Sequence, residues 1–224
     1  MNGPAIILGA GPGLGQALSR RFAAGGFDVA MLARDGSRLN ALSRDVAEET
    51  GRRVYGYPVD ATDLVGLRAS LERVTGDMGP ASVFIHSVSR WIPGRTPDID
   101  PATLMAEMAL SVGAALLGSQ HVLAGMEAAG KGTILWTGSR MGLNPGKNAA
   151  APALGASKCA IRALALSGAK DFHDRGVNFA TVTIDGTIKP GTAFDPRAIA
   201  DAFWEVHAAP REDWVAERIF TGRD

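Results

Sequence analysis

A glycine-rich turn near the N-terminus constrains the fold of this chain more than any other feature. The apolar run Ala5–Leu8 leads into Gly9–Gly15 (GAGPGLG), and an amphipathic helical pattern follows. Glycines let the backbone turn tightly and approach a pyrophosphate closely, and the N-terminus of the next helix supplies free N–H groups and the positive end of a dipole. Such a turn is weak evidence alone, but its place between a strand and a helix predicts a dinucleotide-binding fold.

Short apolar runs alternate with longer helical patterns along the rest of the chain. Apolar strands between helices are typical of a parallel sheet covered on both faces, and right-handed crossovers make such a sheet doubly wound. We therefore predict one α/β domain over residues 1–224, a Rossmann-type doubly wound parallel sheet of about seven strands. The expected strands are Ala5–Gly9, Asp28–Ala33, Arg53–Val59, Ser82–Ser87, Gly132–Thr137, Val177–Ile184 and Trp214–Ile219. The expected helices are Leu14–Ala24, Gly36–Thr50, Thr62–Thr75, Pro101–Ala129, Pro152–Asp174 and Pro196–Ala208.

Composition narrows the function classes. The formal net charge is zero, so no electrostatic footprint indicates nucleic acid or an anionic membrane. We find no apolar run of membrane-spanning length, no room for a signal peptide before Ala5, and no His, Cys, Asp or Glu spacing typical of a metal site. Cys159 is the single cysteine, which fits a reducing compartment. We expect a cytoplasmic protein that binds neither metal, nucleic acid nor membrane.

The end of the second expected strand bears on cofactor choice. An NAD site usually has a carboxylate at this tip, where it accepts hydrogen bonds from the ribose hydroxyls. Here the tip reads Ala33-Arg34-Asp35. A small residue followed by a guanidinium suits a 2′-phosphate, so we predict NADP, with NAD still possible. A surface arginine paired with Asp35 is the alternative interpretation.

Further segments, together with the glycine turn, resemble the short-chain dehydrogenase/reductase family over nearly the whole chain. They are VDATD at Val59–Asp63, VFIHSVS at Val83–Ser89, ILWTGS at Ile134–Ser139 and IDGTI at Ile184–Ile188. The resemblance implies an oxidoreductase with a nicotinamide cofactor and a homo-oligomer that pairs through the helices Pro101–Ala129 and Pro152–Asp174. The cofactor-binding residues implied are Gly9, Gly11, Gly13, Leu14, Gly15, Arg34, Asp60, Ala61, Ser87, Lys158, Gly186 and Ile188.

The resemblance breaks at the catalytic residues. The family uses a tyrosine as general acid/base, a lysine that lowers the tyrosine pKa and holds the ribose, a serine that positions the carbonyl, and an asparagine that holds a water. Ser139 matches the serine and Lys158 the lysine, but Leu154 stands at the tyrosine position and Ser111 at the asparagine position. No tyrosine follows Tyr57, so no other alignment supplies one.

A missing tyrosine leaves two groups that titrate in a useful range. Lys158 can act as an acid if it is desolvated, and His86, at the end of the fourth expected strand, titrates near neutral pH. We therefore expect an oxidoreductase that acts on an unknown carbonyl or alcohol with a non-standard proton donor, with Ser139, Lys158 and His86 as candidate catalytic residues. The alternative is a cofactor-binding sensor or assembly protein that has lost catalysis.

Overall fold

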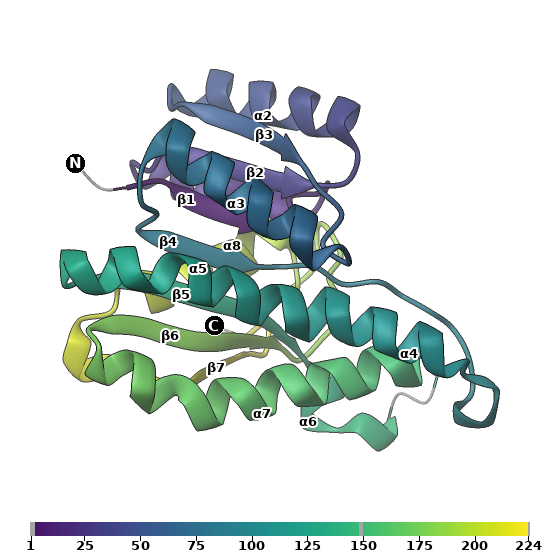
Figure 1. Cartoon of the computed structure of the whole chain (residues 1–224). Helices are drawn as coiled ribbons and strands as arrows, with labels where there is room; N and C mark the ends of the chain where they lie inside the picture. Colours follow the sequence, from purple (N-terminus) through teal and green to yellow (C-terminus); the bar gives the residue numbers. More distant parts are fainter. Residues whose placement is uncertain (1–2, 148–149, 224) are drawn as a thin grey trace.

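A computed structural model describes residues 3–147 and 150–223, and its centre is a seven-stranded parallel sheet. The strand order is β3-β2-β1-β4-β5-β6-β7 (Figure 1). The strands are β1 Ala5–Leu8, β2 Val29–Ala33, β3 Val54–Pro58, β4 Val83–His86, β5 Gly132–Ser139, β6 Val177–Ile184 and β7 Glu217–Phe220. The sheet order reverses between β1 and β4, which is where ligands bind in folds of this kind.

Helices cover both faces of the sheet. They are α1 Leu14–Ala24, α2 Gly36–Thr50, α3 Leu64–Met78, α4 Pro101–Met108, α5 Ala114–Ala129, α6 Arg140–Leu143, α7 Pro152–Asp174 and α8 Pro196–Ala208. The 3₁₀ turns are η1 Thr96–Asp98, η3 Pro145–Lys147 and η4 Arg211–Asp213, and η2 Ala109–Gly113 is a π-helical turn. One core lies between the sheet and α1, α2 and α8, and the other lies beneath α3, α5 and α7 (Figure 1).

The structure confirms the predicted α/β class and parallel sheet. Most strand boundaries and both ends of the third helix differ from expectation by one to three residues, and two of the shifts have an identifiable local setting. The third helix begins at Leu64 rather than Thr62, because the Asp63 carboxylate accepts hydrogen bonds from the backbone N–H groups of Val65 and Gly66 and so caps the helix. The last strand begins at Glu217 rather than Trp214, because the 3₁₀ turn η4 directly precedes Trp214.

A long, nearly continuous helix runs through α4, η2 and α5. Among the described residues it is the one helix whose length and hydropathy would allow it to cross a membrane: 29 residues, Pro101–Ala129, with a mean hydropathy of 1.4 over the best window. The expectation that no apolar run reaches that length is therefore wrong. Part of this apolar helix belongs to the protein core. Of that window, 44% is buried inside the protein, where α5 packs on β4, β5 and α3.

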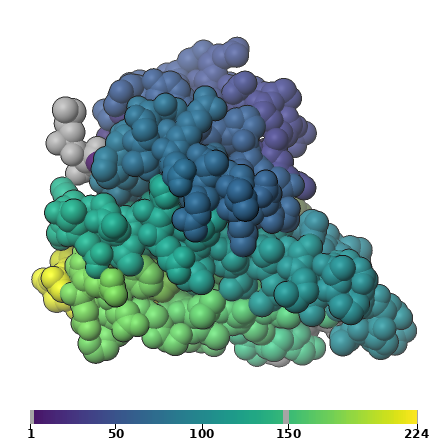
Figure 2. Space-filling model, viewed as in Figure 1, coloured from purple at the N-terminus to yellow at the C-terminus, as the bar shows by residue number. Residues whose placement is uncertain are grey.

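The carboxyl ends of the strands meet at one edge of the sheet. α4, the connection before it and α6 extend beyond this edge (Figure 1). In the space-filling view the segment around α4 projects from the body of the protein (Figure 2). The predicted site residues follow the ends of β1 to β6 or lie on α7, so the fold gathers them at this edge.

Candidate cofactor and active site

The glycine turn after β1 is shaped for a close ligand. Gly9 and Gly13 have φ values of 97° and 99°, which side chains disfavour. A Cβ on Gly9 would lie 2.6 Å from the Ser87 carbonyl, and one on Gly15 would lie 2.2 Å from the Gly9 oxygen, whereas one on Gly11 would meet no atom within 4 Å. The turn therefore packs tightly against neighbouring backbone at Gly9 and Gly15, and it is open at Gly11.

The N-terminus of α1 faces this open space. Gly13 is its cap residue and has no side chain to satisfy the first N–H groups, and no acidic residue lies in the first turn. Uncapped N–H groups and the positive end of the helix dipole form an anion site. Leu14 begins the helix and is buried. The residues present thus fit the pyrophosphate of a dinucleotide.

Two clefts open on either side of the turn. The first, of about 200 Å³, is lined by Leu8, Gly9, Gly11, Leu32, Ala33, Arg34, Val59, Ala61, Ser87, Val88, Ser89 and Leu110. The second, of about 190 Å³, is lined by Gly9, Gly11, Pro12, Leu14, Gly15, Ser87, Val88, Ser89, Thr137, Lys158 and Ile188. The clefts share Gly9, Gly11 and Ser87, so together they form one trough across the ends of the central strands.

Arg34 contributes an exposed guanidinium to the first cleft. Its neighbour Asp35 is engaged elsewhere: it caps α2, accepting hydrogen bonds from the backbone N–H of Arg38 at 3.0 Å and from the Ser37 hydroxyl at 2.8 Å. These hydrogen bonds hold the pKa of Asp35 below its usual range. The carboxylate beside Arg34 is therefore tied to α2.

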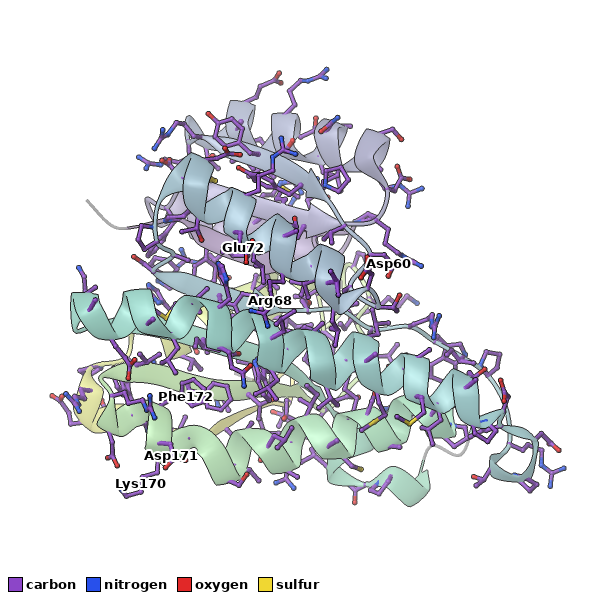
Figure 3. All side chains as sticks on the ribbon, viewed as in Figure 1. Asp60, Arg68, Glu72, Lys170, Asp171 and Phe172 are labelled. Atoms are coloured by element: carbon purple, nitrogen blue, oxygen red, sulfur yellow. The ribbon has the colours of Figure 1, made fainter. Side chains whose placement is uncertain are left out.

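Asp60 follows β3 at the same edge of the sheet (Figure 3). Its carboxylate accepts hydrogen bonds from the backbone N–H and hydroxyl of Thr62 at 2.9 and 2.8 Å, which lower its pKa, and the charge of Arg34 lowers it further. Ala61 is buried. Of these two predicted cofactor-binding residues, Ala61 lines the first cleft and Asp60 directly precedes Ala61 in the chain.

Lys158 reaches the second cleft from α7. Its ammonium donates a 2.8 Å hydrogen bond to the carbonyl oxygen of Thr137, and the side chain is almost fully buried. Burial lowers the pKa of Lys158 from its usual value to about 8, while the negative charge of Glu107 acts in the opposite direction. A lysine with this pKa exchanges a proton near neutral pH.

Leu154 and Ser139 are two other positions that the family resemblance singled out. Leu154, one turn earlier on α7, is buried against Met141 and Ala151. Ser139 ends β5 and caps α6, its hydroxyl accepting a hydrogen bond from the Met141 N–H at 3.2 Å. The Ser139 hydroxyl proton remains available to a carbonyl oxygen, whereas Leu154 has nothing to donate.

His86 is fully buried at the end of β4. The π-helical turn η2 leaves one carbonyl free for this imidazole. The Ala114 N–H bonds to the oxygen of Ala109 rather than to that of Leu110, and the Leu110 oxygen lies 3.3 Å from His86 Nε2. Burial lowers the pKa of His86 to about 3, so the ring is neutral at physiological pH. His86 lines neither cleft, whereas Lys158 lines the second.

The turn after β6 supplies the last predicted contacts. Ile188 is exposed and lines the second cleft with Lys158. Gly186 packs behind it, since a Cβ there would lie 2.2 Å from the Phe194 ring. Within the described residues, no three His, Cys, Asp or Glu side chains are grouped as metal ligands.

Sequence reasoning missed a buried acid beside this site. Glu107, on α4, is fully buried and accepts hydrogen bonds from the hydroxyls of Ser111 and Ser157, and Arg90 lies 3.9 Å from its second oxygen. The available signal was a glutamate four residues before Ser111 in an otherwise apolar pattern.

The parallel sheet, the glycine turn and the trough define a Rossmann-type dinucleotide-binding protein. Residues 4–193 match the model of the short chain dehydrogenase family, and the chain belongs to that family. The structure is similar to the crystal structure of a short-chain dehydrogenase from Rhodopseudomonas palustris, with a TM-score of 0.87, 25% identity and 99% of both chains covered.

Two other proteins are similar to this chain. A metagenomic short-chain oxidoreductase in complex with NADP has a TM-score of 0.86 and 24% identity, with 98% of this chain and 97% of that chain covered. Galactitol 2-dehydrogenase (L-tagatose-forming) from Cereibacter sphaeroides is 27% identical over 173 residues. That alignment covers 77% of this chain and 66% of the length of the galactitol enzyme.

Proposed function

We propose that this protein is an NADP(H)-dependent short-chain oxidoreductase that interconverts a carbonyl compound and its alcohol, with Lys158 as the proton donor. The observation that carries the proposal is the ammonium of Lys158, buried at the wall of the cofactor trough with a pKa of about 8. A general acid works best when its pKa lies near the operating pH. The substrate is not specified by this argument.

The cofactor assignment rests on the trough. The open side of Gly11 and the uncapped N-terminus of α1 suit the pyrophosphate, and the exposed Arg34 suits a 2′-phosphate. Asp35 caps α2 instead of offering its carboxylate to a ribose. The similar metagenomic oxidoreductase was crystallised with NADP, which agrees with this assignment.

Each remaining group has one task in the reaction. When bound, the nicotinamide supplies a hydride to the carbonyl carbon. The Ser139 hydroxyl donates a hydrogen bond that orients the carbonyl oxygen. Lys158 releases one proton from Nζ to that oxygen, and the electrons of the broken N–H bond remain on nitrogen as a lone pair. Water then returns a proton to Lys158. In the alcohol-oxidising direction the neutral amine accepts the proton.

The test compares NADPH oxidation by the wild type, Lys158→Arg and His86→Gln over a panel of aldehydes and ketones. Arginine keeps the positive charge and hydrogen-bond donors but does not give up a proton near neutral pH. We expect Lys158→Arg to lose at least about a hundredfold in turnover, the scale of general acid catalysis, while His86→Gln remains active if it folds.

Calorimetric measurement of cofactor binding distinguishes a wrong proton donor from a protein that binds the cofactor without catalysis. Turnover that survives Lys158→Arg but is lost in a folded His86→Gln variant would refute Lys158 as the donor. Tight NADPH binding without turnover of any carbonyl by the wild type would favour the alternative, a cofactor-binding sensor or assembly protein.

A further inference from the structure

Glu107 lies at the centre of a small buried polar cluster, the Glu107 cluster, made of Glu107, Ser111, Ser157 and Arg90. The Glu107 Oε1 atom accepts hydrogen bonds from Ser111 at 2.7 Å and from Ser157 at 3.1 Å. The Arg90 Nε atom lies 3.9 Å from Oε2. The first three residues are completely buried, and Arg90 is about one third exposed, at 37%. The cluster joins α4, η2, α7 and the connection after β4.

The carboxylate is incompletely compensated. Both Glu107 Oε2 and Arg90 Nε are buried and lack a hydrogen-bond partner among the described residues. The Ser157 hydroxyl also lies 3.0 Å from the Leu154 carbonyl, so its single proton is shared between two acceptors. A buried charge that is not fully paired is costly. The hydrogen bonds to Ser111 and Ser157 join α4 to η2 and α7, and the negative charge of Glu107 acts on nearby groups through a medium of low dielectric.

Lys158 is the nearby group on which this charge acts. It follows Ser157 on α7, and Glu107 is the charged residue that favours its protonated form. Other titratable groups near Lys158 do not replace Glu107. His86 is neutral, Arg162 is paired with Glu217 at 2.7 Å, and Cys159 is a thiol held 3.7 Å from the Met141 carbonyl. The cleft that Lys158 lines also contains the uncharged hydroxyls of Ser87, Ser89 and Thr137.

We propose that Glu107 is a positioning residue for catalysis: it is the buried counter-ion of the Lys158 ammonium, and through Ser157 it holds the Lys158 segment of α7 against α4. Arg90 weakens this effect by placing a second positive charge beside the carboxylate. The catalytic consequence rests on the proposed function, because only a proton-donating Lys158 needs to be charged before hydride transfer. The electrostatic relationship itself does not depend on any substrate.

The decisive measurement is the titration of Lys158 by NMR, using protein with ¹³C at the lysine ε-carbons. The Lys158 signal is assigned by its absence in Lys158→Arg. We expect the Lys158 midpoint to move down by about one to two pH units in Glu107→Gln, the shift that a charge several Å away produces at an effective dielectric of about 20. Glu107→Asp, which keeps the charge, should move it by less.

A second variant keeps the test falsifiable if Glu107→Gln does not fold. Arg90→Met removes the partly exposed positive charge and should move the Lys158 midpoint upward. Ser157→Ala removes one hydrogen bond without changing any charge and should move it least. An unchanged midpoint in Glu107→Gln, or in Arg90→Met where Glu107→Gln does not fold, would overturn the inference.

Activity gives the matching kinetic test. In Glu107→Gln the alkaline limb of the kcat profile for NADPH-dependent reduction should move to lower pH by the same amount as the NMR midpoint. A merely structural role would lower the rate equally at every pH, and that result would overturn the catalytic part. A shifted midpoint in a protein without turnover would refute the proposed reaction while leaving the electrostatic relationship in place.

Discussion

The Lys158 ammonium donates its hydrogen bond to the Thr137 carbonyl across the gap between α7 and β5, over 2.8 Å. This contact fixes the nitrogen at the wall of the trough, which the lysine reaches from a helix that otherwise packs on the sheet. It satisfies one donor and leaves the rest of a buried charge to be compensated by Glu107.

Replacing this lysine should stabilise the protein near neutral pH. The folded-state pKa of about 8 lies below the usual 10.5, so burial of the charged form costs stability below pH 8, and the cost is relieved as pH rises from 8 to 10.5. We expect Lys158→Met to raise the free energy of unfolding at pH 7 by about 1–3 kcal/mol. Urea denaturation at several pH values measures this.

The advantage of Lys158→Met should shrink between pH 8 and 10.5, because the wild-type lysine then becomes neutral. Lys170→Met is the control, since Lys170 is exposed and pairs with Asp174 on the surface of α7. A Lys158→Met variant that is less stable than wild type at pH 7 would show that burial of the charged lysine does not cost stability.

Arg34→Ala should weaken NADP(H) binding and leave NAD(H) binding nearly unchanged. In the proposed cofactor site the guanidinium meets the 2′-phosphate, and a charge-assisted hydrogen bond contributes roughly 1–3 kcal/mol. Calorimetric titration with both cofactors measures the difference. Arg38→Ala is the matched control, because Arg38 is an exposed arginine on α2 that faces Asp35 at 3.8 Å. Equal losses for the two cofactors would contradict the assignment.

Alanine substitutions at two glycines of the turn should have different effects, one on stability and the other on cofactor binding. In Gly15→Ala the new Cβ would lie 2.2 Å from the Gly9 oxygen, so the backbone must shift and the melting temperature should fall. In Gly11→Ala the Cβ meets nothing within 4 Å, so the fold should survive while cofactor binding weakens at least about tenfold, or 1.4 kcal/mol. Undiminished NADPH binding by Gly11→Ala would place the pyrophosphate elsewhere.

Leu154→Tyr should raise carbonyl reduction. Leu154 lies one turn before Lys158 on α7, and a phenol at this position adds a second proton donor. The gain should be smaller than the roughly hundred- to ten-thousandfold that a sole donor contributes, because Lys158 already donates. Leu154→Phe supplies the ring without the hydroxyl and is the control for packing against Met141 and Ala151. If both variants have the same rate as wild type, a donor at position 154 is not what limits the reaction.

We propose a homo-oligomer, and light scattering should give at least twice the chain mass of 23.3 kDa. Large apolar side chains are exposed on α5 and α7, among them Leu116, Leu164 and Leu166. Contact with a second copy would remove them from water. Leu164→Asp should lower the mass, whereas Val65→Asp, on the exposed surface of α3, should not. A monomer mass for the wild type at micromolar concentration would refute the proposal.

Much of the architecture was determined by local sequence. The helix bounds Leu14–Ala24, Gly36–Thr50, Pro152–Asp174 and Pro196–Ala208 were predicted as observed, because glycine or proline marks their ends and apolar residues recur at helical spacing. The all-parallel sheet followed from apolar strands separated by helices. The two clefts lie at the carboxyl ends of the strands, since strand ends of a parallel sheet meet at one edge.

Tertiary structure alone decided the chemistry around Lys158. Glu107 and Ser157 are fifty residues apart in the sequence, |i−j| = 50, yet hydrogen-bond across the packed α4 and α7. The neutral state of His86 likewise depends on complete burial and on the carbonyl that the π-turn leaves for it. Sequence patterns report which face of an element is apolar, but a charge environment depends on distances between elements, and only their packing sets those distances.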